Sequence, residues 1–234
     1  PDPDFFNGSL PGQSIQAVNR RAKFLDIVLA QAHLVVHLRM SGDLRLVATD
    51  DPSLPLPHDR LVLHFTSGYS LAFNDARKFG RVWLLPHTEA LFAPLGPEPF
   101  DPGLTPESFY TMLHARQRAI KPLLMDQHFL AGMGNIYTDE ALFSAGIHPQ
   151  RRSDSLTPVE AETLLATIRE TLLTGIAHNG SSIDWVYKGG AFQNYFQVYQ
   201  QTNNPCPRCG QPIERLVVGQ RGTHICPHCQ PFNP

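Results

Sequence analysis

The chain has 234 residues, 42% of them hydrophobic, which suits one large or two medium domains with real cores. Charged residues interrupt its most apolar stretch, so the sequence excludes a membrane-spanning chain and no membrane partner is expected. A formal net charge of −2 argues against a generic nucleic-acid binder. Short basic clusters stand out nevertheless, and together they fit a groove that follows phosphates, although each alone is typical of a solvated face. They are Arg20-Arg21-x-Lys23, Arg77-Lys78-x-x-Arg81, Arg116-x-Arg118-x-x-Lys121 and Arg151-Arg152.

Residues 1–93 are predicted to form an antiparallel β-sandwich or barrel, the first domain of an α+β multidomain chain. Short apolar or alternating runs recur there between turn signals such as Ser41-Gly42-Asp43. The predicted strands are Ile15–Val18, Phe24–Ala30, Leu34–Leu38, Leu44–Ala48, Leu61–Phe65, Ser70–Phe73 and Arg81–Leu85.

A helical domain is predicted over residues 105–197, after a proline- and glycine-rich linker at 94–104. Thr105-Pro106-Glu107 begins a helix that is predicted to continue to about Gln117. Thr157-Pro158-x-Glu160 is a capping box with proline at the first helical position, and Asn179-Gly180 ends the helix it begins. The apolar stripe of this helix is interpreted as ordinary core; it consists of Ala161, Leu165, Ile168, Leu172 and Ile176.

Glycines precede a further helix, in the segment Gly132-Met133-Gly134-Asn135. Such glycines leave backbone N–H groups accessible at the positive end of the helix dipole, which is a ready anion site. Asn135 could add a side-chain donor. A simple helix–helix turn explains the pattern equally well, and the absence of a β-α-β context excludes a dinucleotide-binding fingerprint.

Four cysteines end the chain as two C-x-x-C pairs, separated by 16 residues within the segment 198–234. This spacing predicts a zinc ribbon in which four thiolates bind one structural Zn²⁺. Two disulfides are the alternative, which the lack of cysteine in the rest of the chain disfavours. Three arginines against one glutamate give this segment a formal charge of +2, and Arg221 lies at the predicted hairpin tip. The predicted ligands are Cys206, Cys209, Cys226 and Cys229.

Five segments resemble, in family order, the signatures of the formamidopyrimidine-DNA glycosylases and their endonuclease VIII relatives. They are NRRAKFLDIVL, VVHLRMSGDLRL, FNDARKFGRVWL, MDQHFLAGMGNIYTDEALFSAGIHP and GQRGTHICPHCQ. The resemblance runs from about Phe5 to Gln230, and the stretch Gly189–Tyr199 looks more like the formamidopyrimidine branch. It implies a β-sandwich, a helix–two-turn–helix domain and a zinc-finger hairpin.

The activity that the resemblance implies is base-excision repair of double-stranded DNA. An oxidised purine, 8-oxoguanine or a formamidopyrimidine, would be flipped out and excised, and the strand nicked by β,δ-elimination. The resemblance also implies a monomeric, cytoplasmic bacterial protein associated with the nucleoid. Three alternatives stay open: a damaged-DNA-binding protein without excision activity, an endonuclease VIII-like glycosylase for oxidised pyrimidines, and a zinc-ribbon interaction protein without a DNA role.

Individual roles follow from matching motif positions. Lys23 matches the lysine that assists elimination, and Arg221 matches the arginine that grips the phosphates around the lesion, a task suited to a bidentate cation. Three residues match the side chains that fill the hole left by the flipped base: Met40, Arg77 and Phe79. Positions that match DNA contacts are His37, His58, Arg116 and Asn135, with Lys121 near the damaged nucleotide, and Arg77 is counted among the DNA contacts too.

The beginning of the chain departs from the family pattern. Family members begin with a Pro-Glu-Leu-Pro-Glu-type segment, whose terminal proline amine attacks the sugar and whose glutamate handles protons. This chain begins Pro1-Asp2-Pro3-Asp4, which aligns better with a later family loop. We therefore expect that Pro1 is not the nucleophile and Asp2 not the proton donor, that the sandwich is incomplete, and that the catalytic proline lies outside the given sequence.

Overall fold

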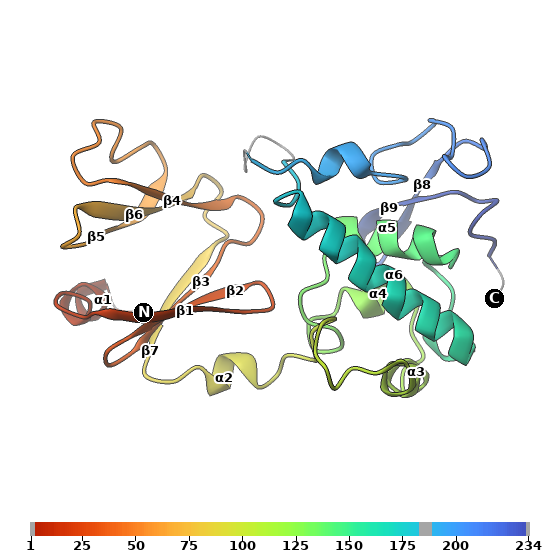
Figure 1. The fold of residues 1–234 in the computed structure, drawn as a ribbon, viewed down its shortest axis with the longest axis horizontal. Coiled ribbons are helices and arrows are strands. Elements are labelled where there is room, and N and C mark those ends of the chain that lie inside the picture. The colour runs from red at the N-terminus through yellow and green to blue at the C-terminus, as the bar shows by residue number, and fades with distance from the viewer. Residues whose placement is uncertain (1–2, 183–188, 233–234) are drawn as a thin grey trace. The chain divides into compact units, whose positions relative to one another are not determined.

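A computed structural model describes residues 3–182 and 189–232. It divides into two compact units (Figure 1): the first lies within residues 3–93, and the second comprises 94–182 and 189–232. Pro1 and Asp2, the subjects of the N-terminal expectation, lie outside the described residues.

The first unit is the predicted sandwich, built from two antiparallel sheets. One sheet has the order β1-β2-β3-β7 and the other has the order β4-β6-β5. The strands are β1 (Ile15–Arg21), β2 (Phe24–Leu29), β3 (His33–His37), β4 (Gly42–Ala48), β5 (Asp59–His64), β6 (Tyr69–Asp75) and β7 (Arg81–Leu85). All seven strand predictions are thus confirmed, with boundaries that differ by a few residues.

Two helices accompany the sandwich, α1 (Pro3–Ser9) and α2 (Glu89–Phe92). Neither helix is among the elements predicted from the sequence, which begin with the strand at Ile15. The α1 sequence nevertheless contains a helix start, since Pro3 occupies the first helical position and Asp4 the first turn.

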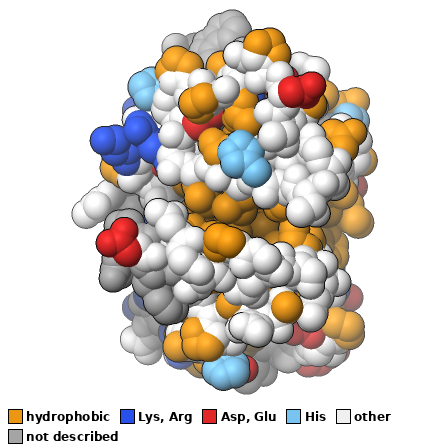
Figure 2. Space-filling model, turned by 90° about the vertical axis from the view of Figure 1, so that its left-hand side faces the viewer, with side chains coloured by type: hydrophobic (Ala, Val, Ile, Leu, Met, Phe, Trp, Pro, Cys, Tyr) orange, Lys and Arg blue, Asp and Glu red, His pale blue; other side chains and the backbone are white. Residues whose placement is uncertain are grey.

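Aliphatic residues of both sheets meet in the core of the first unit. Ile27, Leu29 and Leu34 are buried and pack with Leu63 and Leu71 of the second sheet. One side of this interior stays open as a cavity of about 760 Å³, lined by α1, the end of β2 and β5. Figure 2 shows hydrophobic side chains gathered in a hollow on this face.

The second unit is helical and ends in a two-stranded hairpin. Its helices are α3 (Pro106–His114), α4 (Ile120–Leu124), α5 (Asn135–Ala145) and α6 (Pro158–Ala177), with 3-10 turns η1 (Ser153–Ser155) and η2 (Phe192–Tyr195). The hairpin consists of β8 (Glu214–Val218) and β9 (Arg221–Ile225). None of the helices among residues 3–182 and 189–232 is both long and apolar enough to cross a bilayer.

Helix boundaries follow local sequence signals. The Thr157 hydroxyl oxygen accepts a hydrogen bond from the Glu160 N–H, and the Glu160 carboxylate accepts one from the Thr157 N–H. The predicted capping box is therefore confirmed. Helix α3 ends at His114 rather than near Gln117. Residues 94–104, predicted as a linker, are hydrogen-bonded to the second unit: the Gly96 N–H donates to the Gln127 carbonyl, and the Ala131 N–H to that of Pro97.

The buried face of α6 differs in part from the predicted stripe. Ala161, Leu165 and Ile168 are buried as expected, but Ile176 is 66% exposed. The buried row continues instead through Thr171 and Gly175. Gly175 is required there, because a Cβ atom would lie 2.5 Å from the Tyr137 ring of α5.

Candidate nucleic-acid interface and zinc centre

The four cysteines converge as metal ligands do. Their Sγ atoms all lie within 4.8 Å of one another. The Cys206 and Cys229 sulfurs are 3.8 Å apart, and those of Cys209 and Cys226 are 3.4 Å apart. A tetrahedron with Zn–S bonds of about 2.3 Å has S–S edges of about 3.8 Å, whereas a disulfide requires about 2.05 Å. The geometry therefore fits one structural zinc ion and excludes the disulfide alternative.

Backbone and side-chain contacts support this centre. The N–H groups of Arg208 and Cys229 each point to a cysteine sulfur at 3.4 Å, the contact that steadies thiolate ligands. The Gln230 side chain accepts from the Cys226 N–H and donates to the Ile147 carbonyl. Arg208 binds the carbonyls of Phe143 and Ser144 at the end of α5. The knuckle end of the ribbon is thus anchored to the helical core.

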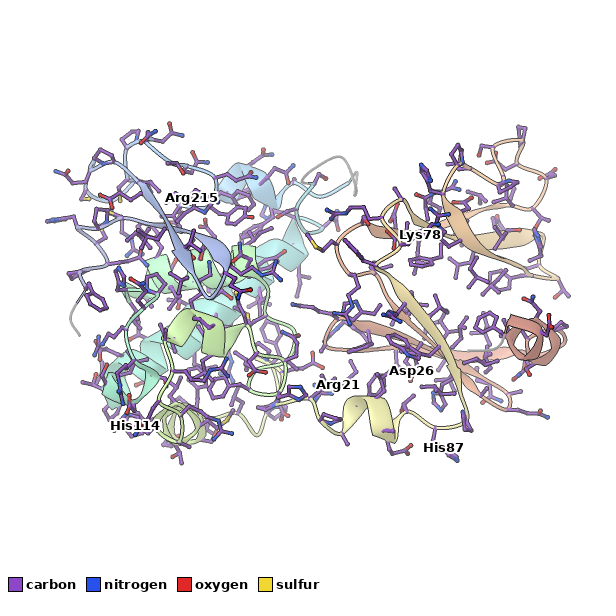
Figure 3. The ribbon with its side chains drawn as sticks, turned by 180° about the vertical axis from the view of Figure 1, so that it is seen from behind. Arg21, Asp26, Lys78, His87, His114 and Arg215 are labelled. Atoms are coloured by element: carbon purple, nitrogen blue, oxygen red, sulfur yellow. The ribbon has the colours of Figure 1, made fainter. Side chains whose placement is uncertain are left out.

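The far end of the hairpin presents Arg221. Val218 pairs with Arg221 across a two-residue turn in which Gly219 and Gln220 have φ values of 57° and 63°. Positive φ at both turn positions is the hairpin geometry that matches strand twist. The Arg221 side chain is exposed at this tip, and Arg215 lies farther down β8 (Figure 3).

The N-terminus of α5 lies against the same hairpin. Gly132 has a φ of 101° and Gly134 is the N-cap, so the glycines serve the backbone as the sequence indicates. Asn135 begins the helix, and its amide donates to the Gly222 carbonyl at 3.1 Å. Its Oδ1 atom is buried without a hydrogen-bond partner among the described residues. The first-turn N–H groups of a helix lack intrahelical acceptors, so this end has donors for an anion.

Lys121 is enclosed within the second unit. Its side chain is wholly buried, and its ammonium binds the Asp139 carboxylate, the Thr223 hydroxyl and the Gly222 carbonyl. Three acceptors satisfy the three donors of an ammonium, so none remains for a phosphate. The assignment of Lys121 to the DNA-binding residues near the damaged nucleotide stays a prediction, and the structure shows that its donors are used within the protein.

Three exposed side chains project from two loops of the first unit. Met40 is 59% exposed just before β4, and Phe79 is 54% exposed after β6. The Arg77 guanidinium carbon lies 5.6 Å from the centre of the Phe79 ring. Lys78 shares this loop (Figure 3) and has a φ of 60°. The structure therefore gathers the three predicted void-filling residues on loops with accessible ends.

One buried carboxylate, that of Asp75, joins these two loops. It accepts the Ser41 hydroxyl, next to Met40, and the Gly80 N–H at 2.6 Å, next to Phe79. Burial alone would raise its pKa, but hydrogen bonds from Ser41 and from the N–H groups of Gly80, Arg77 and Lys78 outweigh burial, so the pKa of Asp75 lies below its usual value.

The remaining predicted residues lie at the ends of strands and helices. Lys23 is exposed in the two-residue turn between β1 and β2, next to Ala22 at φ 52°. His58 is exposed, with a φ of 74°, and its carbonyl accepts the Asp75 N–H. Arg116 is exposed just after α3, where its carbonyl accepts the Ser153 hydroxyl.

His37 ends β3 as a half-buried, neutral imidazole. Its ring packs edge-on against Phe24, and its Nδ1 atom accepts the Arg39 N–H at 2.9 Å. Burial, followed by the charges of Arg39 and Lys23, lowers the pKa of His37 to about 4. The ring hydrogen therefore sits on Nε2, which makes His37 a neutral donor at physiological pH.

Sequence reasoning missed three acidic residues that organise these groups: Asp75, Asp139 and Glu140. The Glu140 carboxylate accepts the N–H groups of Gln197, Val198 and Tyr199, where the chain enters the ribbon. Burial raises the pKa of Glu140. For Asp139 and Glu140 the sequence did contain a signal, since two consecutive acids stand in an otherwise largely apolar helix. A helix that is buried on most sides can hold acids only where they have hydrogen-bonding partners.

Comparisons with known proteins match this arrangement along the chain. The N-terminal domain of formamidopyrimidine-DNA glycosylase matches residues 1–82, and the H2TH domain of the same enzyme matches residues 95–186. A zinc finger found in FPG and IleRS matches residues 203–231. The curated formamidopyrimidine-DNA glycosylase of Brevibacillus brevis is 43% identical over 237 residues, which cover 98% of this chain and 85% of that protein. The same-named protein of Chloroflexus aurantiacus is 44% identical over 237 residues, or 98% and 84% of the two chains.

Solved structures agree. A complex of Lactococcus lactis Fpg with DNA that contains an abasic site has a TM-score of 0.90 and 36% identity, covering 98% of this chain and 86% of that one. MutM (Fpg) from Thermus thermophilus has a TM-score of 0.86 and 40% identity, with 95% and 85% covered. A β-sandwich followed by an H2TH domain and a four-cysteine finger defines a DNA-repair enzyme of the glycosylase/AP lyase class. The chain belongs to the formamidopyrimidine-DNA glycosylase family.

Proposed function

We propose that this protein recognises oxidised purines, 8-oxoguanine and formamidopyrimidines, in double-stranded DNA, excises them by base flipping and nicks the strand by β,δ-elimination. It acts in this proposal as a monomer of the bacterial cytoplasm that works at the nucleoid. The observation that carries the proposal is that a chain of this family has an exposed arginine on its four-cysteine hairpin and also has exposed Met40, Arg77 and Phe79 on its sandwich.

Flipping a base requires that the hole in the stack be filled. Unstacking costs a few kcal/mol, which inserted side chains recover in part. Met40 supplies a flexible apolar probe, Phe79 a rigid ring, and Arg77 a donor fork for the orphaned partner base. Met40 and Phe79 are both more than half exposed, so their ends are accessible for insertion, as this role requires.

Phosphates are the second part of the proposal. Arg221 offers two parallel N–H donors for the backbone around the lesion, and in this role it assists the second elimination. Asn135 at the start of α5, with Arg116, His37 and His58, supplies further backbone contacts. Lys23, exposed in the β1–β2 turn, assists the first elimination beside a phosphate.

The reaction needs an amine that attacks C1′ of the sugar. Attack breaks the glycosidic bond, the base leaves with a proton, and an imine with the opened sugar makes the C2′ hydrogen acidic. Removal of that hydrogen expels the 3′ phosphate, and a second elimination expels the 5′ phosphate. The family takes the amine from an N-terminal proline, and Pro1 and Asp2 lie outside the described residues.

Borohydride trapping on duplexes with one 8-oxoguanine or one abasic site tests the proposal, with the undamaged duplex as control. A covalent adduct with the 8-oxoguanine duplex assigns excision to this chain, because reduction of an imine between the protein and the sugar leaves a stable bond that forms only after the base is removed. Lesion-selective binding without an adduct contradicts excision and supports the alternative of recognition alone. If the protein shows no binding and no adduct, any DNA role is contradicted, and the alternative of a zinc-ribbon interaction protein remains.

An oxidised pyrimidine in the same duplex separates the proposal from the endonuclease VIII-like alternative. The resemblance of Gly189–Tyr199 to the formamidopyrimidine branch favours purines, so 8-oxoguanine should compete better than an oxidised pyrimidine. Preference for the pyrimidine would reverse this assignment.

A further inference from the structure

A buried ion pair connects the helical core to the tip of the zinc hairpin. The Lys121 ammonium lies 2.6 Å from an Asp139 oxygen, and neither side chain is exposed. The other Asp139 oxygen accepts the His224 N–H of β9 at 3.0 Å. The pair therefore joins α4, α5 and β9 at one point.

Two hydrogen bonds continue from this pair to the backbone of Arg221. The Thr223 hydroxyl accepts from Lys121 at 2.7 Å and donates to the Arg221 carbonyl at 3.0 Å. The next carbonyl, that of Gly222, accepts from both Lys121 and Asn135. The carbonyls of Arg221 and Gly222 are thus both hydrogen-bonded by side chains. Those side chains are either part of the helical core, as Lys121 and Asn135 are, or bonded to it, as Thr223 is.

Packing limits the tip in the same way. A Cβ atom at Gly219 would lie 2.8 Å from the Pro122 ring, next to Lys121 in α4. The turn thus docks on α4 at a distance that only glycine allows, and glycine also suits its φ of 57°.

The charges are costly to bury, which indicates a purpose beyond stability. A buried pair is often no more stable than apolar residues of equal volume, yet removal of one partner is strongly destabilising because the other charge is left buried without compensation. Burial lowers the pKa of Lys121 despite the opposing effect of Asp139, and the charge of Arg221 lowers it further.

We infer that Lys121 and Asp139 are positioning residues that fix the hairpin tip, through Thr223 and Gly222, so that Arg221 meets the phosphate backbone in one orientation. Zinc fixes the knuckle end of the hairpin and this pair fixes the tip. The part of the inference that concerns DNA rests on the proposed function. Lys121 acts on DNA through Arg221 rather than by contact.

Hydrogen exchange tests the tip without DNA. Thr223→Val removes both hydroxyl links while nearly preserving shape, and Lys121→Met removes the ammonium. Amides from Val218 to Thr223 should exchange at least about tenfold faster in both variants, while the knuckle amides of Gly210 and Gln230 keep their rates and zinc content stays at one. Unchanged tip exchange would overturn the inference whatever happens to DNA binding.

Matched variants separate a local effect from general loss of stability. Thr163→Val removes a hydroxyl from the exposed face of α6, and Leu113→Ala destabilises the buried core of the same unit. In Thr163→Val, the tip amides should exchange at the wild-type rate. In Leu113→Ala, exchange should accelerate no more at the tip amides than at the knuckle amides. If Lys121→Met fails to fold, Thr223→Val carries the test.

A double-mutant cycle then links the tip to DNA. Thr223→Val should weaken binding to an abasic-site duplex by nearly the factor seen for Arg221→Ala, and the double variant should be within about threefold of Arg221→Ala alone. Additive losses would show that the tip contacts do not act through Arg221. If Arg221→Ala leaves the affinity for the abasic-site duplex unchanged while Thr223→Val and Lys121→Met still accelerate exchange at the tip, the phosphate role of the proposed function fails and the positioning of the tip stands.

Discussion

At the scale of single residues, Asp75 decides where three exposed probes lie. Its carboxylate holds Ser41 beside Met40 and Gly80 beside Phe79, and it is almost fully buried. Gly42 and Gly80 both pack against the Phe73 ring so closely that a Cβ atom would clash. The three side chains therefore project from a rigid base, which would lower the entropy lost on insertion into DNA in the proposed role.

Asp75→Ala should release this base. Loss of the acceptor leaves the Ser41 hydroxyl and the Gly80 N–H without partners, at a cost of about 1–3 kcal/mol each where they remain buried. Chemical denaturation should show lower stability, and affinity should fall more for lesion-containing duplex than for undamaged duplex. Asp75→Asn, which retains one acceptor, should lie between. Equal losses on both duplexes would contradict the link between Asp75 and the probes.

His37 makes the first unit sensitive to acid. Its pKa is lowered to about 4 in the folded protein, mainly by burial, while an unfolded histidine titrates near 6.5. The neutral form is therefore favoured by folding. The stability that it contributes is complete above about pH 6.5 and is lost as pH falls toward 4. Denaturation at a series of pH values should show a loss that is smaller in His37→Gln. An identical pH profile in the variant would exclude His37 as the source.

At the scale of elements, α6 shows which features of the fold could be predicted. Its start signal, the capping box of Thr157 and Glu160, and its end signal, Asn179-Gly180, each span only a few residues, so the sequence alone predicts where the helix begins and ends. Strand alternation and cysteine spacing are local in the same sense. Ile176 was assigned to the core wrongly, since a stripe does not show how far along the helix its neighbours extend.

The buried ion pair could not be predicted for a related reason. Lys121 bonds to Asp139, 18 positions away, and to Thr223, 102 positions away. A lysine in a basic cluster is typical of an exposed face, and only the meeting of α4, α5 and β9 reverses that expectation. The resemblance predicted a role for Lys121 near the damaged nucleotide but did not show that its charge is enclosed.

The capping box of α6 provides a quantitative test at this scale. Thr157→Ala removes the hydroxyl that accepts the Glu160 N–H, which should cost about 1 kcal/mol of stability. Thr163→Ala, within the same helix, removes a hydroxyl that only bonds the Val159 carbonyl and should be neutral or slightly stabilising. Denaturation midpoints compare the two variants. Equal midpoints would exclude a capping contribution.

At the scale of the whole molecule, the zinc centre and the helical core stabilise the ribbon from opposite ends. The ribbon packs in a small core that consists of Phe143 from α5 together with Val198, Cys206, Ile213 and Cys226. Two of these five residues are metal ligands, so much of the folding free energy of the ribbon depends on the ion.

Removal of zinc should therefore unfold residues 200–230 and abolish DNA binding, while the helices of the second unit persist. Hydrogen exchange locates the unfolded segment, and metal analysis verifies removal. Added zinc should restore both structure and binding. Full binding by protein shown to be free of zinc would refute this role of the metal.

The most direct test of the account is the affinity of wild type and Arg221→Ala for a duplex with one abasic site and for the same undamaged duplex, at one fixed salt concentration. Zinc content is verified in both proteins, because metal loss would imitate the mutation. The wild type should prefer the damaged duplex, and Arg221→Ala should lose most of this preference with zinc intact. Equal affinity of the wild type for both duplexes, or an unchanged preference in Arg221→Ala, would contradict it.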